Sequence, residues 1–434
     1  MREIAVAPLV EPYGGGLADL IYNNAAQDPD TVVFSRKVGA GWQDITAAQF
    51  LTQVIDVGKG LIGSGVGAGD RVGILAATRY EWTLFDFAIW AVGGVPVPIY
   101  ATSSTEQVQW ILSDSGAVAV VVENDALQAK VEAVRAEVPT LRQVWNIEKG
   151  AVDEVVAAGA GETAESVDER RKAVKAADVA TIIYTSGTTG RPKGCVLTHA
   201  NFHSEGGNVV EMLSPVFKGM ATEDTSTLLF LPLAHVFGRM VQVGAVQARA
   251  RLGHTADIKK VTEDLASFKP TFILSVPYVL EKVYNGAQQK AHAAGKGKIF
   301  DAAAATAIAY SEANGKAGLG LKLKHAVFDR LVYSKLRAAL GGNAKYAISG
   351  GAALGLRLTH FFRGVGLVVF EGYGLTETTA ALTVNLPDAI KVGSVGRPLP
   401  GTAVRVADDG ELLFRGGQVF AGYWHNEEAT NEAL

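Results

Sequence analysis

The chain reads VATIIYTSGTTGRPKG from Val179 to Gly194, an apolar run that continues directly into a loop of glycine, serine and threonine. The run Val179 to Tyr184 is rich in β-branched and aromatic residues, which predicts a strand. Glycines after a strand let backbone amides approach phosphate oxygens. The stretch therefore predicts a buried strand that ends in a phosphate-binding loop.

The side chains of this loop fit the same chemistry. Threonine and serine hydroxyls can donate to phosphate oxygens, and a lysine can neutralise charge on the outer phosphates. The predicted phosphate-binding residues are Thr185, Ser186, Gly187, Thr188, Thr189, Gly190 and Lys193. The spacing is not that of the common P-loop, which argues against a kinase or GTPase. The alternative is a surface turn, because these residue types are common in loops.

Composition narrows the class of protein. The chain has 434 residues, of which 48% are hydrophobic, so several subdomains are expected. With 40 basic and 44 acidic residues and no basic stripe, a nucleic-acid partner is not expected. The single cysteine, Cys195, allows no intrachain disulfide and argues for a reducing, cytoplasmic setting. No run approaches the roughly 20 apolar residues that span a bilayer, so any membrane contact is expected to be peripheral.

Short apolar runs alternate with longer helical segments, which predicts an α/β fold with buried parallel strands. The expected strands are 71–75, 118–122, 271–276 and 367–370, and the expected helices include 81–92, 105–113 and 329–340. From Gly393 onward, short strands with turn signals predict a β-rich part. We expect a first α/β subdomain over 1–178, a second over 179–392, and the start of a β-rich subdomain over 393–434.

Three further motifs follow in order along the chain. Leu231 to Phe237 reads LPLAHVF and places a histidine beside apolar residues. Ser349 to Ala353 reads SGGAA after a strand, where small residues would let a planar base lie against the backbone. Glu371 to Glu377 reads EGYGLTE after another apolar strand. A carboxylate facing a triphosphate is favourable chiefly when Mg²⁺ lies between them.

Together with YTSGTTGRPKG, these motifs resemble those of the acyl-adenylate-forming superfamily. The later stretches GSVGRP, GELLFRG and GYW extend the resemblance to nearly the whole chain. It implies the large N-terminal domain of such enzymes, with stacked α/β subdomains, mostly parallel sheets and a smaller β-rich subdomain. It also implies that ATP and Mg²⁺ are required and that the ribose-binding aspartate, the hinge and the C-terminal lid domain with its catalytic lysine lie outside the given sequence.

The resemblance assigns roles to individual residues. It implies that Tyr373 stacks on adenine, that Thr376 contacts the α-phosphate, and that Glu377 binds magnesium with help from Thr185. Lys193, Thr376, Glu377 and His235 are the expected catalytic residues. The nucleotide site is further expected to include Gly350, Gly351, Ala352, Glu371, Gly372, Gly374 and Leu375. The acyl pocket is expected to include His235, Val236, Phe237 and Gly351, although a packed core histidine is the alternative for His235.

The segment 285–340 contains a helical, basic, alanine-rich insert that resembles the long-chain fatty acyl-CoA ligase branch. A solvated helical pair without a substrate role is the alternative. The expected reaction is ATP-dependent formation of a fatty acyl-AMP, followed by transfer to CoA, with little complete turnover from this chain alone. Two alternatives stay open: a ligase that loads a carrier protein, and a noncatalytic nucleotide- or fatty-acid-binding module. Cys195 could be a nucleophile, but a buried and inert thiol is the expectation.

Overall fold

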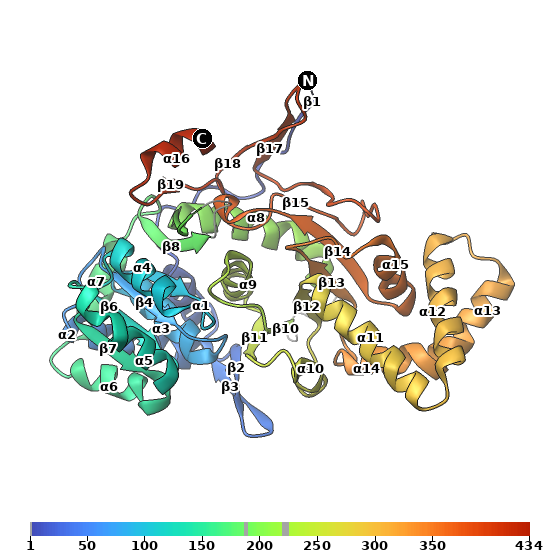
Figure 1. The fold of residues 1–434 in the computed structure, drawn as a ribbon, viewed down its shortest axis with the longest axis horizontal. Helices are drawn as coiled ribbons and strands as arrows, with labels where there is room; N and C mark the ends of the chain where they lie inside the picture. The colour runs from blue at the N-terminus through green and yellow to red at the C-terminus, as the bar shows by residue number, and fades with distance from the viewer. Residues whose placement is uncertain (1, 186–189, 219–224) are drawn as a thin grey trace.

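The computed structural model describes residues 2–185, 190–218 and 225–434. Five sheets and their covering helices make up this part of the chain (Figure 1). The predicted α/β class is confirmed. Each of the four predicted apolar strands forms a strand that takes part in parallel pairing.

The first sheet is parallel throughout. Its order is β5 (Val95–Ile99), β4 (Arg71–Leu75), β6 (Ala119–Val122) and β7 (Gln143–Asn146). The strands β4, β5 and β6 are buried almost throughout, as the unbroken apolar runs predict.

Two further sheets combine parallel and antiparallel pairs. One has the order β10 (Ser226–Leu229), β11 (Arg251–His254), β2 (Val32–Val38) and β3 (Gly41–Thr46). The other has the order β12 (Phe272–Ser275), β13 (Tyr346–Ser349), β14 (Val368–Tyr373), β15 (Thr383–Val384) and β16 (Arg397–Pro398). In both, the parallel strands come first in this order and an antiparallel strand closes the edge.

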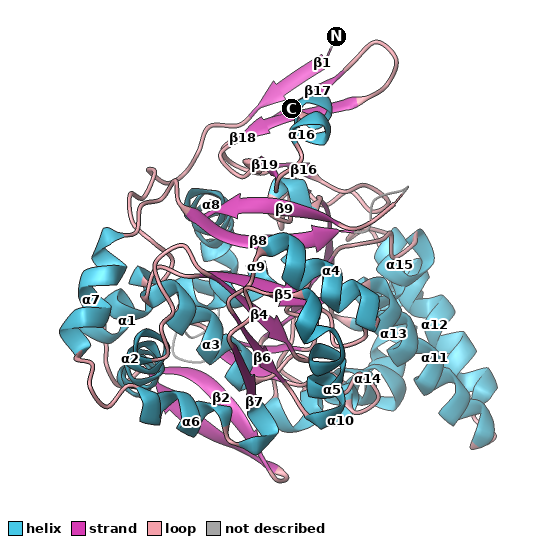
Figure 2. Cartoon of the chain, turned by 60° about the vertical axis from the view of Figure 1, so that its left-hand side comes forward, coloured by secondary structure: helices cyan, strands magenta, loops and turns pink. Residues whose placement is uncertain are grey.

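The remaining two sheets are antiparallel. The hairpin of β8 (Val179–Thr185) and β9 (Lys193–Thr198) pairs with β19 (Gly422–Tyr423). At the top of Figure 2, β17 (Thr402–Val406) lies between β1 (Arg2–Ala5) and β18 (Leu412–Gly416). Sheets thus draw strands from both sides of residues 178 and 392, and the three subdomains stay a prediction about stretches of sequence.

The helices cover these sheets. Their bounds in the first half are α1 (Asp19–Gln27), α2 (Ala47–Gly63), α3 (Tyr80–Ala91), α4 (Thr105–Ser115), α5 (Asp125–Val134), α6 (Ala151–Ala158), α7 (Ala164–Ala173) and α8 (His199–Lys218). In the second half they are α9 (Val236–Gln247), α10 (Val261–Phe268), α11 (Pro277–Ala293), α12 (Gly297–Glu312), α13 (Leu319–Phe328), α14 (Ser334–Ala339), α15 (Leu356–Val365) and α16 (Glu427–Ala433). The predicted helix 329–340 begins with a π-helical turn, Asp329–Tyr333, and continues as α14.

The helix α3 is buried on every side, and its Thr83 and Asp86 side chains are paired with α9. The carboxylate of Asp86 accepts hydrogen bonds from Arg239 (2.9 Å) and Gln242 (2.8 Å). The Arg239 guanidinium lies 5.0 Å from the ring centroids of both Trp82 and Trp90. A buried charge is tolerated when it is paired in this way. Arg239 therefore fixes α9, whose first turn lies at the site described below.

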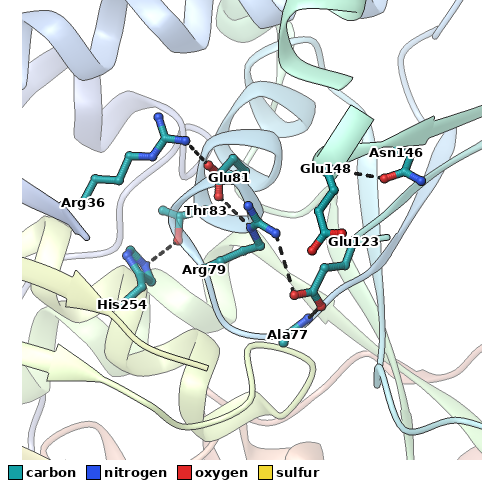
Figure 3. Close-up of polar contacts among 9 residues, drawn as sticks. All are labelled: Arg36, Ala77, Arg79, Glu81, Thr83, Glu123, Asn146, Glu148 and His254. Atoms are coloured by element: carbon teal, nitrogen blue, oxygen red, sulfur yellow. Dashed lines mark hydrogen bonds and ion pairs between the residues drawn. The ribbon is translucent and has the colours of Figure 1, made fainter. Parts of the chain in front are cut away.

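A second polar network joins the parallel sheet to the sheet that holds β2 and β11 (Figure 3). Arg79 lies between Glu81 (2.7 Å) and Glu123 (3.7 Å), and Arg36 of β2 reaches Glu81 at 2.5 Å. The Thr83 hydroxyl lies 2.8 Å from Nε2 of His254 on β11. These contacts orient the two sheets with respect to each other. No helix among the described residues has the length and apolar character needed to cross a bilayer.

Candidate functional site

A polar cavity opens at the end of β8, where the glycine-rich loop begins. Predicted residues from three separate motifs line it, namely Thr185, His235, Val236 and Thr376. Tyr100, Thr102, Ser103, Gln107 and Pro192 complete the lining with nearby apolar residues. Thr185 and Thr376, which are 191 positions apart in the sequence, therefore share one cavity. Ser186, Gly187, Thr188 and Thr189 lie outside the described residues, so their role stays a prediction.

The hairpin that carries the loop is in tight register. Thr185 pairs with Lys193 and Tyr184 pairs with Gly194, so β8 and β9 hold both ends of the loop. The hydroxyl of Tyr184 donates to Asp114 of α4 at 2.6 Å, and the indole of Trp110 donates to the carbonyl of Pro192 at 2.9 Å. The helix α4 thus anchors the base of the loop.

The chain turns sharply after β14, within the stretch EGYGLTE from Glu371 to Glu377. A side chain at Gly374 would place its Cβ 1.3 Å from the carbonyl oxygen of Ala380, so only glycine fits there. Thr379 and Ala380 have positive φ angles of 61° and 137°, which are strained for residues with a side chain. Such strain often accompanies functional sites. Between these points, Thr376–Thr378 form one 3₁₀ turn that directs Thr376 to the polar cavity.

Tyr423 connects Glu377 to the glycine-rich hairpin. The Tyr423 hydroxyl donates to Oε1 of Glu377 at 2.6 Å, and the Nζ of Lys193 lies 5.0 Å from the Tyr423 ring centroid. Burial and the neighbouring Glu377 carboxylate raise the pKa of Tyr423 above its usual range. Tyr423 therefore stays neutral and remains a donor. The structure brings the two predicted charged residues to one side chain: Lys193 lies over the face of the Tyr423 ring and Glu377 accepts from its hydroxyl.

Tyr423 was missed as a polar residue of the site, since the GYW stretch reads as scaffold. Its strand explains its place, because β19 pairs with β9 so that Tyr423 lies opposite Cys195. Cys195 is fully buried, and burial raises the pKa of its thiol well above the ordinary value. This agrees with the expectation of an inert thiol.

His235 is the N-cap of α9. Its Nδ1 accepts a hydrogen bond from the amide of Phe237 at 3.1 Å, so the neutral ring carries its proton on Nε2. The ring is exposed on the cavity side, and partial desolvation by the surrounding protein lowers its pKa from the ordinary value. His235 is thus not a packed core residue, and it offers a neutral N–H to the polar cavity.

The first turn of α9 separates this polar cavity from an apolar one. Phe237 lines the apolar cavity, whereas His235 and Val236 line the polar one. The apolar cavity lies between α8, α9 and the sheet of β12 to β15. Its lining includes Val209, Leu213, Met240, Val241, Gly244, Leu274, Ile348, Ala380 and Ala381. Of the four residues predicted for the acyl pocket, only Phe237 lines this cavity.

Among the described residues that line the apolar cavity, Glu205 of α8 is the one ionisable residue. Its Oε1 accepts from the amide of Ala381 at 2.7 Å, while Oε2 has no hydrogen-bond partner among the described residues. Its side chain is buried, and burial raises the pKa of its carboxyl well above the ordinary value. No motif marks Glu205. An isolated acid within an otherwise apolar helix face is the only signal that could have indicated it.

The glycine loop after β13 lies next to this boundary. A Cβ on Gly350 would be 3.6 Å from the Phe237 ring and 3.7 Å from the carbonyl oxygen of Gly372, so these residues meet closely. The carboxylate of Glu371 accepts from the amide of Leu354 (2.9 Å) and the hydroxyl of Thr359 (3.1 Å). Glu371 therefore holds the loop from within the protein.

The other predicted nucleotide-site residues lie at the surface of this region. Gly351 and Ala352 are exposed beyond β13, and Gly351 has a φ of 81°. Leu375 is 43% exposed, and Tyr373 and Gly372 are half-buried at the end of β14. Gly190 is exposed where the hairpin loop re-enters the described chain. The roles of these residues in binding a nucleotide stay predictions.

The family model described as AMP-binding enzyme matches residues 21–424. The long-chain-fatty-acid–CoA ligase FadD15 of Mycobacterium bovis is 49% identical over the whole chain, which spans 73% of that relative. The inhibitor-bound N-terminal domain of FACL13 from Mycobacterium tuberculosis superposes with a TM-score of 0.74, at 23% identity, over 97% of this chain and 94% of that one. A long-chain-fatty-acid–CoA ligase from Archaeoglobus fulgidus superposes with a TM-score of 0.75 at 20% identity. This superposition covers 99% of this chain and 80% of that one. The two structures show a shared fold, and the family match over most of the chain places this protein among the AMP-binding enzymes.

Proposed function

We propose that the chain activates a long-chain fatty acid with ATP, through acyl-AMP, and that CoA then takes the acyl group as a thioester. The observation that supports this best is the polar cavity lined by Thr185, His235 and Thr376, directly beside an apolar cavity. A reaction that joins a nucleotide to a fatty acid needs these two environments to meet. The similarity to a long-chain-fatty-acid–CoA ligase supports the choice of acid and acceptor.

In this proposal, Lys193 and the hairpin amides bind the outer phosphates, Thr376 contacts the α-phosphate, and Tyr373 stacks on adenine. The carboxylate of the acid attacks the α-phosphorus, pyrophosphate leaves, and the thiol of CoA later opens the mixed anhydride. Catalysis of this kind depends mainly on positioning and charge neutralisation. His235 lies at the boundary between the two cavities, where its N–H can orient the reacting carboxylate.

The residues present suit Mg²⁺ held jointly by protein and substrate. No cluster of three ligating side chains occurs among the described residues, so the protein does not form a closed metal cage there. Mg²⁺ commonly binds through one or two carboxylates plus substrate phosphates. Glu377, which follows the cavity-lining Thr376, would hold the ion together with Thr185 of the same cavity, and the ion would neutralise phosphate charge. Oε1 of Glu377 is oriented by Tyr423.

The apolar cavity is proposed to hold the acyl chain. It extends from Phe237 between α8 and α9, and its lining is aliphatic apart from a few residues such as Glu205 and Thr225. Burial of methylene groups favours long chains by about 0.8 kcal/mol each. Peripheral contact with a membrane, where such acids reside, belongs to the same proposal.

The test is pyrophosphate release by the full-length protein with palmitate and ATP, with and without CoA. Lys193→Ala and Glu377→Ala should each lower the rate by about 10²- to 10³-fold, since each removes charge stabilisation at the phosphates. Lys298→Ala and Glu312→Ala, both on the exposed face of α12, are matched controls and should leave the rate unchanged. Unchanged activity of both site variants would overturn the assignment.

The acceptor is tested in the same assay. Release of pyrophosphate without formation of the CoA thioester, with the acyl group moving to a carrier protein instead, would replace CoA as the acceptor while keeping adenylation. Binding of ATP and palmitate without any pyrophosphate release would favour a noncatalytic binding module.

A further inference from the structure

The helix α13 presents an apolar face to solvent. Leu319 is 86% exposed, Leu323 71%, Val327 50% and Leu331 52%. A spacing of four residues places Leu319, Leu323 and Val327 along one side of α13, and Leu331 follows in the π-helical turn Asp329–Tyr333. Few large apolar side chains elsewhere in the described chain are as exposed as Leu319 and Leu323. We refer to Leu319, Leu323, Val327 and Leu331, with Lys322 and Lys324, as the α13 face.

The opposite side of α13 is well packed, so the exposure is a property of a stable helix. Nε2 of His325 donates to the carbonyl of Gly364 at 2.7 Å, and its ring stacks on Tyr310 with centroids 3.9 Å apart. His325 also lies 5.0 Å from the ring of Tyr333. These contacts fix which side of α13 faces outward. Figure 1 shows α13 at the outer edge of the molecule, beyond α12.

Basic residues flank the apolar stripe on both sides. Lys322 and Lys324 adjoin Leu323, and at about 100° per residue they lie on opposite sides of it. Both lysines are exposed, and neither forms an ion pair within the described part of the chain. Residues 316–335 contain five basic side chains and one acidic side chain, Asp329, which is paired with Arg337. This local positive charge contrasts with the net charge of −4 of the whole chain.

The stripe continues into a groove between α11, α12 and α14. Leu331 lines this groove together with Tyr278 and Ile299, which are 60% and 46% exposed. Lys282, Lys290, Lys296 and Lys335 also line it, and Glu281 is the one acidic residue among its described lining residues. The apolar and basic character thus extends beyond α13 itself.

We propose that the α13 face docks on an anionic lipid surface. An exposed apolar stripe flanked by lysines suits the boundary between lipid headgroups and acyl chains, because long lysine side chains can extend to the phosphates. Each lysine near an anionic leaflet strengthens binding by about fivefold. A symmetric contact between two copies of this face would set lysines against lysines, which is unfavourable. This proposal identifies the surface that would make the peripheral membrane contact included in the proposed function. It does not depend on catalysis.

The test is co-sedimentation of the full-length protein with vesicles, without ATP or fatty acid, so that a failure of the catalytic proposal does not affect it. Vesicles of phosphatidylcholine with about one third phosphatidylglycerol should bind the protein more tightly than pure phosphatidylcholine. Leu319→Gln/Leu323→Gln should weaken binding to the anionic vesicles by about tenfold or more. Lys322→Gln/Lys324→Gln should weaken it by about 30-fold and reduce the preference for anionic lipid.

The matched control is Leu9→Gln/Leu412→Gln, which changes two exposed leucines elsewhere, 53% and 47% exposed. It should bind vesicles as the unchanged protein does. Unchanged binding of both α13 variants would overturn the proposal. So would light scattering that shows a dimer which Leu319→Gln/Leu323→Gln converts to a monomer, because a second copy would then cover the face. Thermal unfolding midpoints equal to that of the unchanged protein would show that the variants are folded.

Discussion

Two cavities meet at the first turn of α9, and they are built in different ways. The polar cavity is formed by short motifs at strand ends, which bring Thr185, His235 and Thr376 together. The apolar cavity is formed by the long sides of α8 and α9 and by the sheet of β12 to β15. Reactive groups must be placed within a fraction of an ångström, whereas an acyl chain needs only apolar volume of suitable length. For this reason motifs mark the first cavity and almost none marks the second.

The largest effect is expected where one turn serves both cavities. Gly374→Ala would force a Cβ to within 1.3 Å of the carbonyl oxygen of Ala380, so the turn that carries Thr376 and Ala380 must shift. The free energy of unfolding should fall by about 3 kcal/mol or more, measured by denaturant titration. Gly286→Ala, whose Cβ would meet nothing within 4 Å in α11, is the control. Equal stability of the two variants would contradict the tight turn.

The next largest effect should come from blocking the apolar cavity, which should impair activity with long acids more than with short acids. Gly244 lines the apolar cavity, and its Cβ position is open. Gly244→Leu should fill the cavity and lower kcat/KM for palmitate by about 10- to 100-fold, because a blocked chain loses the burial of several methylene groups. Activity with a short acid should fall much less.

The control for this change is Gly286→Leu, also at an open helical position but remote from the cavity. Steady-state kinetics over a series of acids of increasing length provides the measurement. An equal loss for all chain lengths would mean that the cavity does not hold the acyl chain.

A smaller effect should be confined to the polar cavity. Tyr423→Phe removes the 2.6 Å hydrogen bond that orients Glu377 but leaves the ring beside Lys193. The loss of one such bond is worth about 1 kcal/mol, so adenylation should slow about fivefold and require more Mg²⁺. The distant Tyr310→Phe serves as the control. A change in acyl-chain preference, with no change in the requirement for Mg²⁺, would argue against this role of Tyr423.

The smallest effect should be a change in how the free energy of unfolding depends on pH, caused by Glu205 of the apolar cavity. Burial raises the pKa of Glu205, so the folded state binds its proton more tightly than the unfolded state does. The contribution of Glu205 to stability is therefore fully present below its unfolded pKa and is lost as pH rises toward its raised pKa. Glu205→Gln should be less sensitive to rising pH in this range. Urea unfolding over a series of pH values tests this, with the exposed Glu211→Gln of the same helix as control.

Much of the fold follows from local patterns. The apolar runs at 71–75 and 118–122 become β4 and β6, because buried parallel strands carry uninterrupted apolar sequence. Among the turn signals after Gly393, the stretch Asp408 to Gly410 lies between two strands, β17 and β18, and Gly410 has a φ of 93°. The segment 162–177 carries eight charged side chains and contains the helix α7. Its charged composition indicated exposure but not backbone conformation.

The arrangement of strands into sheets could not be read from these patterns. The strands β2 and β3 join β10 and β11, and β19 joins the hairpin that carries the glycine-rich loop. Such pairings depend on long-range burial and on which sheet edges are free, which local sequence does not specify. Tyr423 reaches Glu377 only through the pairing of β19 with β9. Likewise, Arg239 forms a buried ion pair with Asp86 only because α9 packs against α3.

The sequence by itself determined the family of this protein and the kinds of chemical group that it places around a phosphate, since strand, glycine loop and charged residues have local physical causes. Only the tertiary structure decided that Phe237 lines one cavity while His235 lines another, that Glu205 is buried within the apolar cavity, and that the α13 face is left uncovered. The reason is that burial and pairing are properties of neighbours distant in sequence. The glycine-rich stretch by itself indicates phosphate binding, whereas the residues that contact it are brought there by the surrounding fold.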